Sequence, residues 1–311
     1  ILHILAAGIR KVMEEAHLDY GKLQEIRLRT DQPLLILYQG EELFLPAGRA
    51  KKHMVTKEEI KETLEYSSHY SLYAYENEIR QGFLTVEGGH RIGVCGQVMQ
   101  LNGRINRIYP ILYLNIRIAR ERKACGALLY KQLWREQEPE NTLLLSAPGN
   151  GKTTLLRDLI RLFSNGDEAH PGKRIGLVDE RSEIGGSYQG IPQNDVGIRT
   201  DVLDCCSKAE GMVMLLRSMA PQVIAVDEIG NYEDIRAIEM TLNSGCKLLA
   251  TVHGSSIDEI RKKPLLERLI KEHVFERYII LQKETAGKIG KVREIYDERG
   301  TCLYQRQRSV C

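Results

Sequence analysis

The stretch Ser146-Ala-Pro-Gly-Asn-Gly-Lys152-Thr153-Thr154 decides the fold of this chain. An apolar run at 143–145 precedes it, and apolar residues at helical spacing follow it between 155 and 160. A buried strand that leads through a glycine-bearing loop into a helix is the layout of a phosphate-binding P-loop. Gly149 and Gly151 let the backbone amides converge on an anion, and the helix N-terminus adds partial positive charge.

This motif predicts a site for a nucleoside triphosphate with Mg²⁺. Lys152 can reach the β- and γ-phosphates, and the Thr153 hydroxyl can ligate the metal. Ser146 stands where the first glycine of the motif is usual, and a small residue there still holds the turn. The alternative is a chance Gly-Lys-Thr in a surface turn, which the flanking strand and helix disfavour. The residues expected to contact the nucleotide are Pro148, Gly149, Asn150, Gly151, Lys152, Thr153 and Thr154.

The composition is that of a soluble globular protein with room for two domains. Of the 311 residues, 42% are hydrophobic and 28% charged, and 44 Lys plus Arg face 42 Asp plus Glu. The balanced charge gives no strong field toward nucleic acid, and no apolar run approaches the roughly 20 residues that span a bilayer. The seven cysteines have neither a C-x-x-C pair nor metal-ligand spacing, which predicts reduced thiols in a cytoplasmic protein.

Residues 1–123 predict an N-terminal α+β domain that carries no catalytic constellation. A capping box of Thr56 with Glu59 marks the start of a helix, and the charged stretch 120–123 marks the boundary. Alternating or apolar patterns predict strands at 25–29, 34–38, 41–45, 83–86, 91–94 and 114–118.

Residues 124–311 predict an α/β domain. Apolar strands alternate with helical patterns, which implies a mostly parallel sheet with helices on its faces. Ligands of such sheets bind at the carboxyl ends of the strands, where the P-loop lies. The expected strands are 142–146, 174–179, 223–227, 247–252 and 276–281, with a terminal hairpin in 289–306.

One of these strands leads into Asp227-Glu228, the apolar-then-acidic signature of a Walker B element. Asp227 can hold Mg²⁺ through water beside Thr153. Glu228 can orient a water molecule or sense the γ-phosphate. The alternative is an N-cap acid for the helix that starts near Asn231.

A second strand continues into the acidic segment Asp179-Glu180-Arg181-Ser182-Glu183. Three carboxylates within five positions repel one another unless a cation or a water network lies among them. Beside a Mg²⁺–phosphate centre, Asp179, Glu180 or Glu183 can polarise the attacking water. The alternative is a solvated loop whose acids pair with Arg181.

One histidine and two arginines complete the candidate catalytic set. His253 follows another strand, where it can hydrogen-bond the γ-phosphate, although a lone histidine is more often structural. Arg199 and Arg217 are the candidates for arginine fingers. Surface arginines mostly form salt bridges, which is their alternative role.

Taken together, these elements resemble the secretion (traffic) ATPases of type II and type IV systems. The resemblance rests on the P-loop, the acidic box 178–183, Asp227-Glu228 and the histidine segment 250–254. The finer pattern is similar to the stage III sporulation protein AA family of endospore-forming bacteria. That pattern comprises 177–185, 195–202 and 216–230, with 25–29 and 89–96 in the first half.

The resemblance implies a RecA-like P-loop NTPase domain behind a smaller N-terminal α+β domain. It implies a homohexameric ring that holds ATP and Mg²⁺ between the two domains, reached by a neighbour's arginine. Lys152 and Thr153 then take the Walker A roles, and Glu180 or Asp179 activates water. Glu228 falls on the Walker B glutamate and His253 on the histidine box. Asp227 stands where those enzymes have glycine, and Arg217 is displaced by one position from their arginine pair.

The function implied by the resemblance is that of a Mg²⁺-dependent ATPase, the motor subunit of a secretion-like transport complex. It would act at a membrane during endospore formation, in the cytoplasm on the mother-cell side. Its partners would be further copies of itself and membrane-embedded subunits of the channel.

Two alternative functions stay open. The segment Asp227-Glu-Ile-Gly230 also fits the D-x-x-G pattern of a GTP-binding switch, although no Asn-Lys-x-Asp motif accompanies it. A RecA-type nucleic-acid motor is the other, and the lack of a basic stripe disfavours nucleic acid as a partner.

Overall fold

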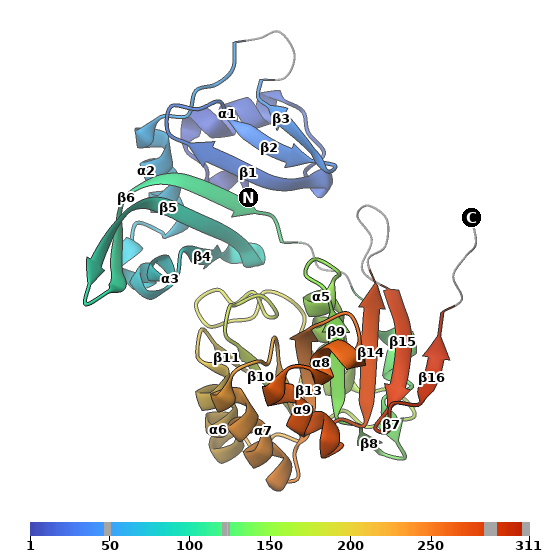
Figure 1. Cartoon of the computed structure of the whole chain (residues 1–311). Helices are drawn as coiled ribbons and strands as arrows, with labels where there is room; N and C mark the ends of the chain where they lie inside the picture. Colours follow the sequence, from blue (N-terminus) through green and yellow to red (C-terminus); the bar gives the residue numbers. More distant parts are fainter. Residues whose placement is uncertain (47–50, 120–122, 124, 283–290, 307–311) are drawn as a thin grey trace. The chain divides into compact units, whose positions relative to one another are not determined.

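The computed structural model describes residues 1–46, 51–119, 123, 125–282 and 291–306. The chain divides into two compact units, each with its own sheet and core (Figure 1). The first unit comprises 1–120 with 186–193, and the second comprises 121–185 with 194–311. Most of the predicted boundary at 120–123, and residue 124, lie outside the described residues.

The first unit is built on an antiparallel sheet of six strands in the order β3-β2-β1-β6-β5-β4. The strands are β1 (Leu23–Arg29), β2 (Leu35–Tyr38), β3 (Glu41–Phe44), β4 (Phe83–Val86), β5 (His90–Leu101) and β6 (Arg104–Arg117). The helices are α1 (Ala7–Glu15), α2 (Lys57–Ser67) and α3 (Glu76–Arg80), with short 3₁₀ turns at Leu2–Ile4, Tyr20–Lys22, Leu72–Tyr75 and Glu87–Gly89. Every strand predicted in this half is present.

Helix α2 begins as its sequence predicts. The Thr56 hydroxyl accepts from the Glu59 amide at 3.1 Å, and the Glu59 carboxylate accepts from the Thr56 amide at 2.9 Å. These two bonds satisfy donors that the first turn of a helix leaves without an intrahelical partner. Helix α1 was not predicted; it buries Ile9 and Met13 in the core of this unit.

A segment from the predicted second domain belongs with the first unit. Residues 186–193 cluster there. The Gln193 side-chain oxygen accepts from the Gly88 amide at 3.0 Å, and the Tyr188 ring lies 6.2 Å from the ring of His69.

The second unit is built on a sheet of eight strands in the order β11-β10-β12-β13-β9-β14-β15-β16. The strands from β11 to β14 are parallel, and β15 and β16 add an antiparallel edge. The strands are β9 (Thr142–Ser146), β10 (Ile175–Asp179), β11 (Thr200–Asp204), β12 (Val223–Val226), β13 (Lys247–His253), β14 (Arg277–Gln282), β15 (Lys291–Asp297) and β16 (Cys302–Gln305). The five predicted apolar strands are present, each end within one residue of its prediction.

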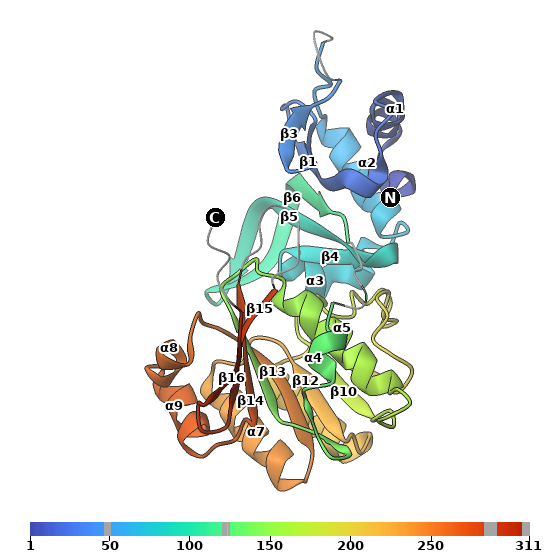
Figure 2. The same cartoon turned by 90° about the vertical axis from the view of Figure 1, so that its right-hand side faces the viewer.

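Helices cover both faces of this sheet (Figure 2). On one face, α4 (Ala127–Tyr130) and α5 (Lys152–Asn165) pack on Leu144 and Leu177. The other face carries four helices, which pack on Leu143, Leu145 and Val178. They are α6 (Lys208–Ser218), α7 (Tyr232–Asn243), α8 (Ile257–Arg261) and α9 (Pro264–Lys271). Because successive strand side chains point to opposite faces, strands that are apolar throughout can serve both layers.

Strand β11 was not predicted. All five of its residues are half-buried, and it forms the edge of the sheet beside β10. An edge strand with acidic residues lacks the apolar run by which a buried parallel strand is found in a sequence.

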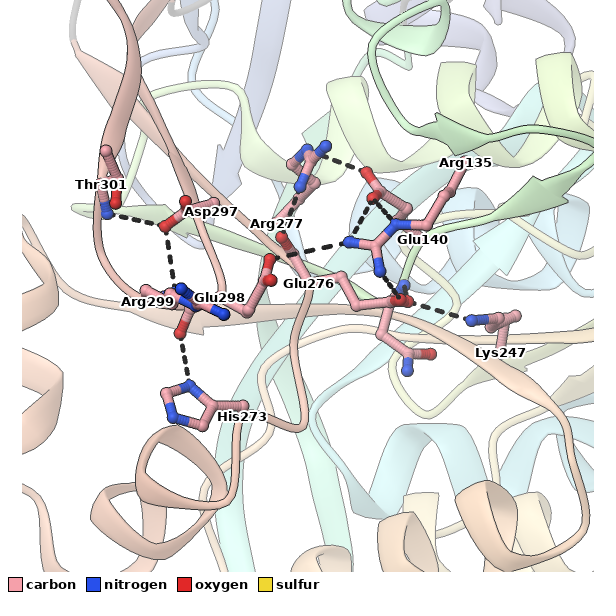
Figure 3. A network of polar contacts seen from close by, with 11 residues as sticks. Arg135, Glu140, Lys247, His273, Glu276, Arg277, Asp297, Glu298, Arg299 and Thr301 are labelled. Atoms are coloured by element: carbon pink, nitrogen blue, oxygen red, sulfur yellow. Dashed lines mark hydrogen bonds and ion pairs between the residues drawn. The ribbon is translucent and has the colours of Figure 1, made fainter.

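A network of charged side chains fixes the amino-terminal ends of β9, β13 and β14 (Figure 3). Buried Glu140 pairs with Arg277 at 2.8 Å and with Arg135, from the short hairpin of β7 (Trp134–Arg135) and β8 (Glu138–Pro139), at 3.1 Å. Glu276 accepts from the Asn141 amide at 2.8 Å and pairs with Lys247 at 3.0 Å. Burial raises the pKa of Glu140, although both arginines oppose that shift.

We expect Leu144→Ala to lower the free energy of unfolding of the second unit by about 2–5 kcal/mol, because Leu144 is fully buried in β9. Leu128→Ala is the matched control: Leu128 is 83% exposed on α4, and its loss should change stability by less than about 0.5 kcal/mol. Chemical denaturation of both variants measures the difference. Equal losses would contradict the assigned packing of β9.

Candidate functional site

The predicted P-loop joins β9 to α5. Gly149 and Gly151 have φ of 77° and 80°, a region that glycine enters without the strain other residues carry. A Cβ built on Gly149 meets no heavy atom within 4 Å. Gly151 is the N-cap of α5 and has no side chain to cap the helix, so the first-turn amides are available to an anion.

The other predicted nucleotide contacts belong to the same turn. Pro148 is exposed and Asn150 is buried. Thr153 and Thr154 are half-buried in the first turn of α5.

Parallel strand pairing brings the predicted chemical groups to one edge of the sheet. The order β10-β12-β13-β9 places the acidic box, Asp227-Glu228, His253 and the P-loop side by side at the carboxyl ends of these strands. His253 pairs in register with Ser146, the last residue of β9. The carboxyl edge is where ligands of parallel sheets bind.

Hydrogen bonds link α5 to β12 and β13 through Asp227. The Thr153 hydroxyl donates to Asp227 Oδ2 at 3.0 Å, and the buried Thr251 hydroxyl donates to Asp227 Oδ1. Thr251 Oγ1 in turn accepts from the Glu228 amide at 2.9 Å. Asp227 is therefore not the N-cap acid of α7, a position that Asn231 occupies in a capping box with Asp234.

Three nitrogen-bearing side chains converge on the Glu228 carboxylate. Lys152 Nζ lies 3.7 Å from Oε1, His253 Nε2 lies 2.8 Å from Oε1, and Arg181 Nη1 lies 3.2 Å from Oε2. Lys152 Nζ also lies 3.4 Å from His253 Nδ1. An ammonium group can only donate, so Nδ1 is the acceptor and Nε2 carries the proton that His253 donates to Glu228.

Lys152 is only 5% exposed. Desolvation lowers the pKa of its ammonium group, and the neighbouring Asp227 and Glu228 oppose that shift. A buried cation is costly unless an anion pairs with it. Glu228 supplies an anion 3.7 Å from the Lys152 ammonium group, and Asp227 adds a second favourable charge.

Asp179 organises the acidic box. It is 2% exposed and accepts from the backbone amides of Glu183 at 2.9 Å, Ile184 at 3.0 Å and Gly185 at 2.7 Å. Burial raises the pKa of its carboxyl group to about 6, a shift that the three amide donors oppose. Both oxygens are thus engaged with the loop that follows β10.

The remaining carboxylates of the box have different surroundings. Glu180 pairs with Lys208, which is buried at the start of α6. Glu183 is exposed, and its carbonyl accepts from Arg157 of α5 at 2.7 Å. A pocket at this edge is lined by Asp179, Glu180, Arg181, Glu183, Asp227 and Glu228.

The Thr153 hydroxyl and the Asp227 carboxylate fit Mg²⁺, a hard cation that takes oxygen ligands and keeps several of its waters. Their 3.0 Å contact places both oxygens at the start of α5, beside the P-loop amides. Among the described residues, no group of three or more His, Cys, Asp or Glu side chains has the arrangement of a dedicated metal site. Mg²⁺ is usually bound through one or two protein oxygens together with water and phosphate oxygens, which matches the Thr153–Asp227 pair.

The two finger candidates do not lie beside the P-loop of their own chain. Arg199 precedes β11, and its Nη1 donates to the Ser164 carbonyl at 3.0 Å, at the far end of α5. Arg217 is exposed in the last turn of α6, shortly before β12 begins. Both therefore lie toward the amino-terminal edge of the sheet, and a role toward a neighbouring copy stays a prediction.

Three residues of the site were not recognised as functional from the sequence. Arg181 was interpreted only as a partner for the acids of its own loop, yet it contacts Glu228. Thr251 and Lys208 were not singled out, because their partners Asp227 and Glu180 are distant in sequence. Of these three residues, Thr251 is the easiest to recognise from the sequence, since it is the one polar residue in the apolar run 248–252.

We expect Asp179→Asn to lower the free energy of unfolding by about 1–3 kcal/mol, because the amide group must face at least one backbone N–H that now donates to a carboxylate. It should also speed proteolysis within 180–194. Asp258→Asn is the control, since that side chain is 83% exposed. Denaturation and limited proteolysis give the comparison, and equal effects would refute the ordering role of Asp179.

Similarities to known proteins cover nearly the whole chain. The model of the family described as sporulation stage III, protein AA matches residues 1–303. The chain is 39% identical to stage III sporulation protein AA of Bacillus subtilis (strain 168) over 306 residues, which cover 97% of this chain and 96% of that protein. It is 29% identical over 183 residues to Protein SEEDLING PLASTID DEVELOPMENT 1 of Arabidopsis thaliana, covering 58% of this chain and 26% of that protein.

Two solved structures share the fold. The ATPase DotB of Legionella pneumophila matches with a TM-score of 0.60 at 15% identity, over 94% of this chain and 81% of that chain. The pilus retraction motor PilT with bound ADP matches with a TM-score of 0.59 at 16% identity, over 99% of this chain and 83% of that chain. These similarities confirm the predicted fold class, a RecA-like P-loop domain behind a smaller N-terminal α+β domain. The family-model match over residues 1–303 and the 39% identity show that the chain belongs to the sporulation stage III protein AA family.

Proposed function

We propose that this chain binds ATP with Mg²⁺ and hydrolyses it, as a motor subunit of a secretion-like transport complex at a membrane during endospore formation. The observation that carries the proposal is the placement of a P-loop beside the Asp227-Glu228 strand end, with Lys152 buried against Glu228. A buried lysine at the N-terminus of an uncapped helix, with hard oxygen ligands 3.0 Å apart beside it, suits a triphosphate and its metal.

Each residue then has a distinct task. Lys152 and the amides of 149–154 bind the phosphates, and Thr153 with Asp227 would hold Mg²⁺, which would supply positive charge beside the phosphate oxygens. Glu228 polarises a water molecule whose oxygen attacks the γ-phosphorus. The bond from that phosphorus to the β–γ bridging oxygen breaks, giving ADP and inorganic phosphate, and Glu228 takes the proton of the water.

Glu228 is preferred to Asp179 and Glu180 as the base. Both Asp179 oxygens accept from backbone amides, and Glu180 pairs with buried Lys208. Glu228 is held by side chains that a phosphate can also engage, namely Lys152, His253 and Arg181. It can therefore be released when a triphosphate binds.

Membership of the family supports the proposed cellular setting. The resemblance to secretion ATPases supports a homohexameric ring whose partners are membrane-embedded subunits, with the chain on the cytoplasmic, mother-cell side. Two solved structures of the same fold are described as an ATPase and as a pilus retraction motor with bound ADP. Among the described helices, none is both long and apolar enough to cross a bilayer.

The GTP-binding switch is less well supported. In the segment that fits D-x-x-G, the Gly230 amide donates to Asp234 Oδ2 at 3.0 Å, within the cap of α7. That donor is occupied by the helix cap and is not directed at a phosphate.

We expect Lys152→Ala to weaken the binding of a non-hydrolysable ATP analogue by about 10- to 100-fold, because a charge-assisted contact to the phosphates is lost. Lys262→Ala is the control, an exposed lysine whose loss should leave the affinity within about twofold. Titration calorimetry with Mg²⁺ present measures both. Unchanged affinity in the Lys152 variant would contradict a nucleotide site at the P-loop.

Glu228→Gln should retain nucleotide affinity and lower turnover by about 10²- to 10⁴-fold, since the amide cannot accept the proton. Glu233→Gln, on the exposed first turn of α7, serves as its control. Steady-state phosphate release gives the rates. Full turnover in the Glu228 variant, with loss in Glu183→Gln, would transfer the role of base to the acidic box.

A further inference from the structure

The three groups around Glu228 come from three different strand ends. Lys152 follows β9, Arg181 follows β10 and His253 ends β13. All three contact one carboxylate within 3.7 Å. A site that gathers donors from separate elements around one small anion has the form of an oxyanion-binding site.

The backbone holds Glu228 in an unusual conformation at this point. Its φ of 56° lies in the left-handed region, which a residue with a Cβ adopts only under backbone strain. The Glu228 amide is held by Thr251 Oγ1, and the next amide, of Ile229, donates to the Thr251 carbonyl at 2.9 Å. Thr251 thus fixes the turn that brings the carboxylate to the three donors.

We propose that Arg181 recognises the γ-phosphate within its own subunit, and that the Glu228 carboxylate takes the place of that phosphate when no nucleotide is bound. The proposal rests on the proposed ATPase function. A carboxylate and a phosphoryl group are both oxyanions, and a guanidinium group binds either through parallel N–H groups. Lys152 needs an anion in both states, because it is buried.

The loop that carries Arg181 is fixed, whereas the side chain itself is accessible. Asp179 and Arg157 hold the loop through the backbone amides of 183–185 and the carbonyls of Glu183 and Ile184, directly after Arg181. The Arg181 side chain is 61% exposed and lines the acidic pocket. A ligand can reach this guanidinium without opening the core.

The inference gives Arg181 a role in discriminating triphosphate from diphosphate. A diphosphate can engage Lys152 and the P-loop amides but has no third phosphate for Arg181, so Glu228 keeps its partners. A triphosphate draws Arg181 and Lys152 away from Glu228. The carboxylate is then free to polarise water, which couples recognition of the γ-phosphate to turnover.

The test compares the dissociation constants of ADP and of a non-hydrolysable ATP analogue, both with Mg²⁺, by calorimetry. Arg181→Ala should raise the dissociation constant of the analogue by about 10- to 100-fold and change that of ADP by no more than about twofold. Arg181→Lys should restore part of the loss, because it keeps the charge without the planar fork. Arg236→Ala, on the exposed face of α7, is the matched control and should change neither.

Three results would overturn the inference. Arg181→Ala could lower the affinity for ADP and for the analogue equally, or lower neither, or the Arg236 variant could lose as much affinity for the analogue as the Arg181 variant. Thermal unfolding of each variant shows whether it is folded, and the Arg181→Lys result decides the matter should the alanine variant be unstable. If the unmodified chain binds neither nucleotide, the proposed function itself fails. If it binds both, and Arg181→Ala does so equally well, only the inference on Arg181 fails.

Discussion

The contact of the Thr153 hydroxyl with Asp227 is the interaction on which the site depends, because it joins the P-loop helix to the neighbouring strand ends. Asp227 also accepts from Thr251, and Thr251 accepts from the Glu228 amide. A side chain on α5, the end of β12 and the middle of β13 are thus connected through polar atoms at the carboxyl edge. This connection places Glu228 beside buried Lys152.

The alignment of the strand ends at this carboxyl edge is set by contacts at the amino-terminal ends of the same strands. There the Asn141 side chain accepts from the Leu248 amide at 2.8 Å, and Glu276 holds both the Asn141 amide and Lys247. These bonds fix where β9 and β13 start. The lengths of β9, five residues, and of β13, seven residues, then place Ser146 and His253 in register with each other at the carboxyl edge. A buried ion pair often adds little net stability, so the contribution of this network is better understood as fixing strand position.

The sequence was sufficient for the features that local pattern and parallel topology control. The P-loop, the strand ends that carry Asp227 and His253, and the capping box of α2 each depend on residues within one element and its neighbours. The contacts of Arg181 with Glu228, of Glu180 with Lys208 and of Asp227 with Thr251 could not be predicted, because each joins elements tens of residues apart. The position of Arg199 could not be predicted for a related reason: half-buried β11 was not recognised, so nothing in the sequence placed the arginine before it beside the end of α5.

The acidic box shows how neighbouring acids acquire different chemistry. Asp179 ends a strand and is buried, and backbone amides donate the hydrogen bonds that water would give an exposed carboxylate. The next residue, Glu180, forms an ion pair with Lys208. The repulsion expected among these carboxylates is relieved in part by the backbone amides at Asp179 and by the Lys208 ammonium group at Glu180. Asp179 and Glu180, which are neutralised in this way, are better suited to fixing the loop than to polarising water. Its rigidity positions Arg181, which leaves Glu228 as the carboxylate whose partners a phosphate can exchange.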